Sequence, residues 1–178
     1  MVKKVLVFAG STSSESINKK LATFAAKNLK NTSFEIIDLR DFNLPIYNID
    51  IEKEAIPEDA KRFSSLLDSH DGYILSLAEH NGSYAAAFKN IFDWSSRIEK
   101  KVFREKPLLL MSASPGGRGG ASVLSAASST FPHMGAKNIT TFSLPNFFDN
   151  FKDDAIINPE LLSSLISKTD EFENYLNQ

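Results

Sequence analysis

Apolar and polar positions follow two recurring patterns along the chain. Short apolar runs come at intervals, and between them lie segments with an apolar residue at every third or fourth position. The first pattern is typical of strands covered on both faces, and the second of helices that pack one face on a sheet. The predicted strands are Val5–Phe8, Phe34–Leu39, Gly72–Leu77, Pro107–Met111 and Lys137–Phe142. The predicted helices are Ser16–Leu29, Pro57–Ser69, Ser83–Ile98, a segment from the end of Ser112–Gly120 to about Phe131, and Pro159–Leu176, while Arg40–Ile51 reads as an irregular loop.

This alternation of strands and helices predicts an α/β fold. Parallel neighbouring strands need a helix-sized connection, so the strands should form a parallel sheet with helices on both faces. We expect a flavodoxin-like three-layer sandwich whose five-stranded parallel sheet has the order 2-1-3-4-5. No repeat or low-complexity linker divides the chain, so residues 1–178 are expected to form a single domain. In this topology ligands bind at the carboxyl ends of the strands, near the switch point between strands 1 and 3.

The first strand-to-helix connection carries a candidate anion site. Gly10 ends the apolar run and allows a sharp turn, and Ser11–Ser16 supplies a series of hydroxyl groups. A helix that begins near Ser16 presents unpaired N–H groups and a partial positive charge at its first turn. These donors suit a phosphate without any lysine. We therefore expect a terminal phosphate monoester to bind here.

Two further loops should reach the same edge of the sheet, because they follow the third and fourth strands. Ala78–Ser83 contains Asn81 and Gly82, which allow a tight turn with positive φ and bring backbone groups toward a planar ligand. Ser112–Gly120 has glycines on both sides of Arg118, so a flat ring can lie against the backbone while the guanidinium reaches an anion or stacks. Two glycine-bearing loops beside a phosphate loop suit FMN.

The same loops resemble those of the NADPH-dependent FMN reductase family, which includes flavodoxin-like flavin, quinone, azo-dye and chromate reductases. The resemblance rests on three ordered motifs and covers most of Val2–Phe148. The first motif is carried by Gly10, Ser11, Ser16, Asn18 and Leu21. The second is carried by His80, Asn81 and Ser83, followed by Phe88, Lys89, Asn90, Asp93 and Trp94. The third is carried by Ser114, Gly116, Gly117, Arg118, Gly119 and Gly120.

The resemblance implies a cofactor, a reaction and a set of binding residues. NADPH, with NADH open as an alternative, would pass hydride through FMN to a small acceptor by a ping-pong mechanism, without a catalytic side chain. The acceptor would be a free flavin, a quinone, an azo compound or a metal oxyanion. A homodimer is expected, with a homotetramer as the alternative. The residues implied in FMN binding are Ser11, Ser13, Ser16, Ile17, Asn18, Glu79, His80, Asn81, Gly82, Ser83, Ser114, Pro115, Gly116, Gly117 and Arg118.

Three positions depart from the family pattern. Ser13 stands where the family usually has Arg, so the phosphate loses a charge-assisted contact, and Glu15 adds a negative charge nearby. These changes leave open whether FMN is held tightly or is a diffusible substrate. His80 replaces the usual Tyr, and an imidazole that gains a proton near neutral pH would favour the anionic reduced flavin.

Two aromatic-rich segments have more than one explanation. The apolar residues of Ser83–Ile98 cover more than one helical stripe, which fits either a helix buried in its own core or one that also meets a second subunit. The resemblance favours the second subunit. Phe147, Phe148 and Phe151 fit the core, a dimer contact or the acceptor pocket, and we expect the core.

Composition excludes several kinds of site and partner. The absence of Cys excludes disulfides, thiolate catalysis and Cys-ligated metal centres, and no metal site is expected. A formal net charge of -2 gives no electrostatic reason to expect nucleic acid or an anionic membrane as a partner. No stretch approaches the ~20 apolar residues of a bilayer-spanning helix. The expected location is the cytoplasm.

A flavodoxin-like electron carrier is the main alternative function. Such a carrier binds FMN but lacks a site for a pyridine nucleotide. Flavodoxins tend to be strongly acidic, whereas this chain has 20 Lys and Arg residues against 22 Asp and Glu residues. A hydrolase would need a G-x-S-x-G motif and an NTPase the lysine of a Walker loop, and the sequence has neither.

Overall fold

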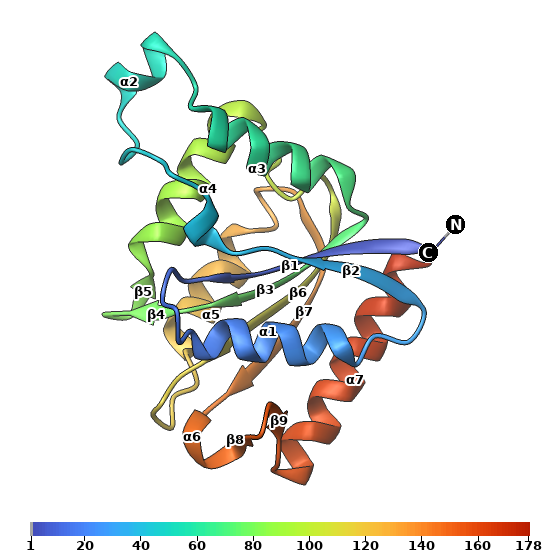
Figure 1. The fold of residues 1–178 in the computed structure, drawn as a ribbon. Helices are drawn as coiled ribbons and strands as arrows, with labels where there is room; N and C mark the ends of the chain where they lie inside the picture. The colour runs from blue at the N-terminus through green and yellow to red at the C-terminus, as the bar shows by residue number, and fades with distance from the viewer. Residues whose placement is uncertain (1) are drawn as a thin grey trace.

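The central element is a five-stranded parallel sheet, seen in a computed structural model that describes residues 2–178. Its strand order is β2-β1-β3-β6-β7, which confirms the predicted flavodoxin-like order (Figure 1). All neighbouring strands in this sheet run parallel, so their carboxyl ends lie at one edge. The strands are β1 (Lys3–Gly10), β2 (Thr32–Ile36), β3 (Gly72–Leu77), β6 (Lys106–Ala113) and β7 (Ala136–Leu144).

Helices cover both faces of the sheet, as the apolar pattern predicts (Figure 1). One face carries α1 (Ile17–Lys27) and α7 (Pro159–Leu176), and the other carries α3 (Glu58–Ser69), α4 (Ala86–Ile98) and α5 (Ala121–Thr130). Side chains of β1 alternate between the two faces, with Val5 and Val7 in one core and Leu6 and Phe8 in the other. Within residues 2–178, no helix is both long and apolar enough to cross a membrane.

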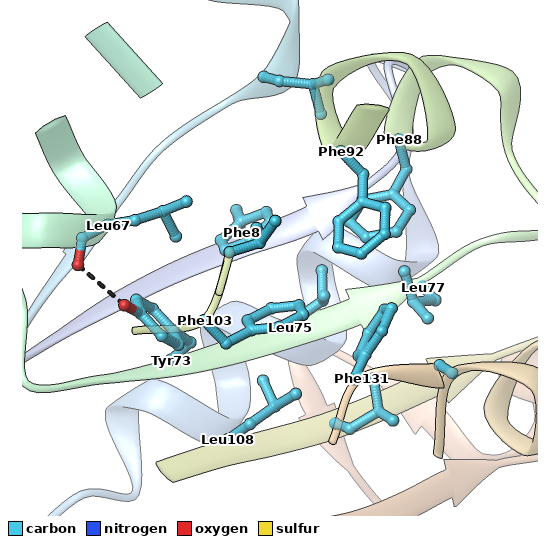
Figure 2. Close-up of a cluster of buried hydrophobic side chains, with 14 of the residues drawn as sticks. Phe8, Leu67, Tyr73, Leu75, Leu77, Phe88, Phe92, Phe103, Leu108 and Phe131 are labelled. Carbon is cyan, nitrogen blue, oxygen red and sulfur yellow. Dashed lines mark hydrogen bonds between the residues drawn. The ribbon is translucent and has the colours of Figure 1, made fainter. Parts of the chain in front are cut away.

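Aromatic rings fill the core beneath α4 and α5. The Phe131 ring lies 4.6 Å from the Phe103 ring and 5.4 Å from the Phe92 ring, measured between centroids (Figure 2). Deeper in the cluster, the Tyr73 hydroxyl donates to the Leu67 carbonyl oxygen at 2.8 Å, and burial raises the pKa of that phenol. Aromatic pairs of this kind add to the free energy that burial of their apolar area supplies.

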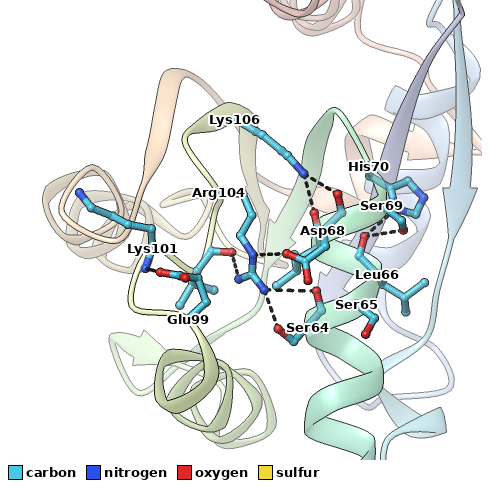
Figure 3. Close-up of polar contacts among 12 residues, drawn as sticks. Ser64, Ser65, Leu66, Asp68, Ser69, His70, Glu99, Lys101, Arg104 and Lys106 are labelled. Atoms are coloured by element: carbon cyan, nitrogen blue, oxygen red, sulfur yellow. Dashed lines mark hydrogen bonds and ion pairs between the residues drawn. The ribbon is translucent and has the colours of Figure 1, made fainter.

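Two cations close the carboxyl end of α3. Lys106 Nζ donates to the carbonyl oxygens of Leu67 and Asp68 at 2.8 and 2.9 Å (Figure 3). Arg104 Nε donates to the Asp68 carboxylate at 2.7 Å, and its guanidinium also reaches Ser64. The last carbonyl groups of a helix lack hydrogen-bond donors and carry partial negative charge. Cationic side chains there supply donors and offset that charge. Desolvation lowers the pKa of Lys106. These contacts fix the carboxyl end of α3 beside the first residue of β6, at the end of the sheet opposite the carboxyl ends of the strands.

The second predicted strand and the loop after it differ from the expectation. The strand begins earlier and ends at Ile36, because Asp38 caps a 3-10 turn, η1 (Leu39–Asp41), by accepting from the Arg40 N–H at 2.9 Å. The predicted loop Arg40–Ile51 also contains the start of a short helix, α2 (Ile49–Glu54), which projects from the body of the molecule (Figure 1). None of the residues of α2 is buried, and Ile49 is 57% exposed.

The predicted helix Ser83–Ile98 is wrong at its beginning. Ser83 and Tyr84 form β5 (Ser83–Tyr84), which pairs antiparallel with β4 (Glu79–His80), and the helix starts only at Ala86. Its aromatic residues are explained by this chain alone, since Phe88, Phe92 and Trp94 are all buried in the structure.

The segment after β7 also contains structure that the sequence did not reveal. A short helix, α6 (Phe147–Asn150), is followed by a hairpin of β8 (Phe151–Lys152) and β9 (Ala155–Ile156). Phe147 and Phe151 are buried, as expected, but Phe148 is 63% exposed, so its assignment to the core is wrong.

The two environments of phenylalanine give a stability prediction. Phe131→Ala should lower the free energy of unfolding by about 3–5 kcal/mol, since it empties a fully buried site between aromatic rings. Phe148→Ala is the matched control and should change it by less than ~0.5 kcal/mol. Urea denaturation of both variants measures the difference, and equal losses would contradict the packing described above.

Candidate functional site

The three predicted loops meet in one pocket at the carboxyl edge of the sheet. The pocket has a volume of about 210 Å³. It is lined by Ser11, Ser13, Glu15, Ser16, Ile17, Asn18, Ala78, Glu79, His80, Ala113, Ser114 and Pro115. Most of the residues implied in binding are therefore together. Those that do not line the pocket are Asn81, Gly82, Ser83, Gly116, Gly117 and Arg118.

The amino end of α1 supplies free donors to this pocket. Ser16 caps the helix, with its Oγ accepting from the Lys19 N–H and its carbonyl oxygen from the Lys20 N–H, both at 3.1 Å. The N–H groups of Ile17 and Asn18 have no acceptor within residues 2–178. Unpaired donors at a helix start, together with the helix dipole, attract an anion.

Serine hydroxyls surround the same helix end. Ser11 Oγ accepts from the Ser13 N–H at 3.2 Å, and Ser13 Oγ accepts from the Glu15 N–H at 3.3 Å. Both hydroxyls keep their own hydrogens for donation, because they act here as acceptors. The serine side chains therefore stabilise the conformation of the loop and still offer O–H donors.

Asn18 connects the helix to two strands. Its Oδ1 accepts from Ser76 Oγ at 2.7 Å and from the Ala113 N–H at 2.8 Å, and its Nδ2 donates to the Ala113 carbonyl oxygen at 3.2 Å. Asn18 is 3% exposed, so its side-chain amide is buried and its hydrogen bonds are made to other protein groups. Asn18 thus joins α1 to β3 and β6 through its side chain, and its backbone N–H stays without an acceptor among residues 2–178. Ser76 was missed in the sequence, although a lone polar residue within the apolar strand Gly72–Leu77 was its signal.

Glu79 links the second loop to the third. Its Oε2 accepts from the Val123 N–H at 2.9 Å, in the first turn of α5. A carboxylate at a helix start pairs an unsatisfied N–H and complements the dipole. Glu79 therefore makes a backbone contact that fixes α5 relative to β4.

A tight turn connects β4 to β5 and holds His80 beside the pocket. Asn81 and Gly82 both have positive φ, 52° and 77°, as the sequence predicts. His80 pairs with Ser83 across this turn. The side chain of His80 is thereby presented to the pocket by a short hairpin, while the turn residues lie at its tip.

The glycines of the site divide into two groups. A Cβ on Gly119 or Gly120 would run into the side chains of Ser143 and Ser112, and both residues have positive φ. A Cβ on Gly116, the residue after the lining residue Pro115, would meet no atom of the described protein within 4 Å. Gly10 lacks the positive φ that a sharp turn would use. It is required by close packing, since its Cβ would lie 2.9 Å from Leu77 Cδ2.

Charges around the pocket are mostly paired. Lys19 Nζ lies 2.5 Å from the Asp38 carboxylate, and Lys20 Nζ lies 3.8 Å from Glu15. Hydrogen bonds from Arg40 and then from Lys19 hold the pKa of Asp38 well below its usual value. Arg118 Nη2 donates to Ser122 Oγ at 3.0 Å. Among residues 2–178, the lining of the pocket contains no Lys or Arg.

The Glu79 contact gives a local test. Glu79→Ala should speed hydrogen exchange of the Val123 amide about tenfold, the equivalent of ~1.4 kcal/mol, because that N–H loses its acceptor. Glu99→Ala is the control, since Glu99 accepts from the Lys101 N–H away from α5. Amide exchange followed by NMR measures both variants. An unchanged rate at Val123 in Glu79→Ala would show that this carboxylate does not cap α5.

Comparisons with known proteins identify the family. The sequence model of the NADPH-dependent FMN reductase family matches residues 3–149. A quinone reductase of Pseudomonas putida is 36% identical over 121 residues, which are 67% of this chain and 64% of that protein. A second quinone reductase, from Pseudomonas putida KT2440, is 30% identical over 98% of this chain and 95% of its own length.

A solved structure extends the likeness to the whole fold. The flavoenzyme NAD(P)H:(acceptor) oxidoreductase FerB from Paracoccus denitrificans matches with a TM-score of 0.79 and 26% identity, covering 99% of this chain and 98% of that one. An FMN-dependent NADH-azoreductase from Bacillus anthracis, solved with FMN, shares the fold at a TM-score of 0.64 and 16% identity. Motifs, fold and relatives agree, and this chain belongs to the NADPH-dependent FMN reductase family of oxidoreductases.

Proposed function

We propose that this chain binds FMN in the pocket at the carboxyl edge and transfers electrons from NAD(P)H to a small acceptor. The observation that carries the proposal is the meeting of a helix start with free N–H groups, serine hydroxyls and a glycine-rich loop in one pocket. Bound FMN would supply the redox chemistry, taking hydride from the nicotinamide and passing electrons on in a ping-pong cycle.

The donors of the first loop fit a phosphate. The N–H groups of Ile17 and Asn18 and the hydroxyls of Ser11 and Ser13 all belong to residues that line the pocket. Backbone N–H groups and hydroxyls bind a phosphate monoester without a cationic side chain. These four residues would hold the phosphate group, and Ser16 would fix the helix end that presents them.

The other two loops fit a flat ring system. Ser114 and Pro115 line the pocket, and a Cβ on the next residue, Gly116, would meet no protein atom within 4 Å. The loop is held in place from behind, because Ser114 carbonyl oxygen accepts from the Phe147 N–H and Gly116 carbonyl oxygen from the Asn146 N–H, both at 3.0 Å. His80 lines the pocket from the hairpin side. These residues would orient the ring, and Arg118 lies outside the lining, where it would meet an anionic group of the nicotinamide nucleotide.

The relatives suggest which acceptors to test first. Two of them are named quinone reductases, and the solved relative is named for an unspecified acceptor. Quinones are therefore the first acceptor class, followed by free flavin, azo compounds and metal oxyanions.

The decisive experiment follows the flavin spectrum. The purified protein should bind added FMN and should lose its flavin absorbance when NADPH or NADH is supplied without air, and a quinone should restore it. Binding of FMN without reduction by either nucleotide would favour an electron carrier. Failure to bind any flavin would overturn the proposal.

Removal of one helix cap tests the phosphate site. Ser16→Ala should raise the Kd for FMN about 3–10-fold, because it removes the cap that orders the helix start and its free N–H groups. Asn158→Ala is the matched control, since Asn158 caps α7 in the same way, by accepting from the N–H groups of Glu160 and Leu161. Both variants should lose ~1 kcal/mol of stability, and only the first should bind FMN more weakly. Equal FMN affinities, measured by fluorescence titration, would show that α1 does not hold the phosphate.

A further inference from the structure

A second pocket lies along α1, next to the pocket at the carboxyl edge. It is formed between this helix and the turn of the β8–β9 hairpin, which lie on the same side of the sheet, and its volume is about 220 Å³ (Figure 1). We call it the α1 groove. It is lined by Ser14, Ser16, Lys19, Lys20, Thr23, Phe24, Lys27 and Asp154. Because Ser16 lines both pockets, the two adjoin at the amino end of α1.

The polar side chains of the α1 groove form one stripe along the helix. Side chains three or four residues apart share a face of a helix. This spacing connects Ser16, Lys20, Thr23 and Lys27. Since a helix rises about 1.5 Å per residue, the stripe extends ~16 Å from Ser16 to Lys27. An elongated ligand that lies along α1 therefore meets hydroxyl groups and ammonium groups in turn.

The two adjoining pockets differ in charge. The lining of the carboxyl-edge pocket includes Glu15 and Glu79 and, among residues 2–178, neither Lys nor Arg. The α1 groove is lined by three lysines against one carboxylate, that of Asp154. Cationic side chains are thus gathered beside the proposed FMN site and not within it. Their position favours a second anionic group, distinct from the phosphate that the helix start would hold.

The three lysines are not equally available to a ligand. Lys19 Nζ lies 2.5 Å from the Asp38 carboxylate, and Lys20 Nζ lies 3.8 Å from the Glu15 carboxylate. Lys27 is exposed and has no carboxylate partner among residues 2–178. An ammonium group that no carboxylate neutralises keeps its full attraction for a phosphate. Lys27 is therefore the lysine of the groove that is free to pair with an added anion.

The remaining lining residues suit a nucleoside. The Phe24 ring is half-buried and meets the Phe151 ring edge-on, 5.8 Å away between centroids, so part of the ring stays in the lining of the groove. Asp154 is exposed at the turn of the hairpin. Bases stack on aromatic rings, and a carboxylate accepts hydrogen bonds from ribose hydroxyls or a base amino group. An aromatic ring, a carboxylate and an unpaired ammonium group together fit a phosphorylated nucleoside.

We propose that the α1 groove binds the adenosine end of NADPH, with its 2′-phosphate paired with Lys27, and so makes this oxidoreductase prefer NADPH to NADH. The inference rests on the proposed function, which places the nicotinamide at the flavin in the adjoining pocket. Because Ser16 lines both pockets, one elongated dinucleotide can occupy the two. The 2′-phosphate is the group that distinguishes NADPH from NADH, so a cation that pairs with it sets the preference.

Adenosine 2′,5′-bisphosphate tests the α1 groove without a nicotinamide or a redox step. It is titrated by calorimetry into the FMN-loaded protein at low ionic strength, where an exposed ion pair is little screened. Its Kd should rise about tenfold in Lys27→Gln, which removes one charge-assisted contact. Adenosine 5′-monophosphate lacks the 2′-phosphate, so its Kd should be the same for the wild-type chain and for Lys27→Gln.

Two further variants serve as controls. Lys27→Arg keeps the positive charge and should keep most of the affinity for the bisphosphate. Lys100→Gln removes an exposed lysine outside the α1 groove and should leave the Kd unchanged. Both comparisons separate a specific contact of Lys27 from the general effect of one positive charge on the net charge of the protein.

Steady-state kinetics connect the α1 groove to nucleotide preference. Lys27→Gln should raise KM for NADPH about tenfold and leave kcat near its wild-type value, because the lost contact is equally strong before and during the reaction. KM for NADH should not change, since NADH has no 2′-phosphate. Equal effects on the two nucleotides would contradict the pairing of Lys27 with that group.

The outcomes distinguish this inference from the proposed function. Equal Kd values of the bisphosphate for the wild-type chain and Lys27→Gln overturn the role of Lys27. Displacement of the bisphosphate by an equal concentration of inorganic phosphate overturns recognition of the nucleoside. Either result leaves FMN binding intact. Absence of FMN binding by the wild-type chain overturns the proposed function itself, and the bisphosphate titration, repeated without FMN, still reports on the α1 groove.

Discussion

The geometry of the pocket depends on one buried amide. Asn18 lies at the start of α1 and is hydrogen-bonded to Ser76 of β3 and to both backbone groups of Ala113 at the end of β6. A buried amide without partners is costly, so the three elements are favoured only in the arrangement that satisfies it. The helix start and the glycine-rich loop therefore keep a fixed distance from each other. Glu79 adds a second link of this kind between the hairpin and α5.

Charge is distributed around the pocket in an uncommon way for an anion site. Lys19 and Lys20 lie on the helix next to it, yet each is paired, with Asp38 and Glu15 respectively. The usual Arg of the family is replaced by Ser13, which contributes a hydroxyl in its place. The donors in the lining are backbone N–H groups and hydroxyls, which are uncharged and form weaker hydrogen bonds to an anion than a guanidinium does.

Most of the fold could be predicted from the sequence, because strands and helices of ordinary length carry clear apolar periods. The strand order, the start of α1 at Ser16 and the bounds of α7 were all predicted. The short elements could not be predicted, since two to six residues carry no clear apolar period and some of these elements depend on contacts distant in sequence. The loop that leads to α2, for example, is held at its base by Trp94 Nε1, which donates to the Pro45 carbonyl oxygen at 2.8 Å.

The location of the site could be predicted from the sequence, but not its individual contacts. Parallel strands bring their carboxyl ends together, so the meeting of the three loops followed from topology. The individual hydrogen-bond partners could not be predicted, because a contact such as that of Glu79 with Val123 joins residues far apart in sequence. The binding roles of the individual residues and the homodimer stay predictions.

The glycines of the β6–α5 loop include positions that close packing restricts to glycine and a position that it does not restrict. Gly119 and Gly120 sit against Ser143 and Ser112, so any side chain there must displace a neighbour and strain the backbone. Gly116, on the same loop, has empty space where its side chain would be. A side chain at Gly116, next to the lining residue Pro115, would therefore displace no neighbour and should cost little stability. One loop thus combines two positions that packing restricts to glycine with one position where a side chain would disturb nothing around it.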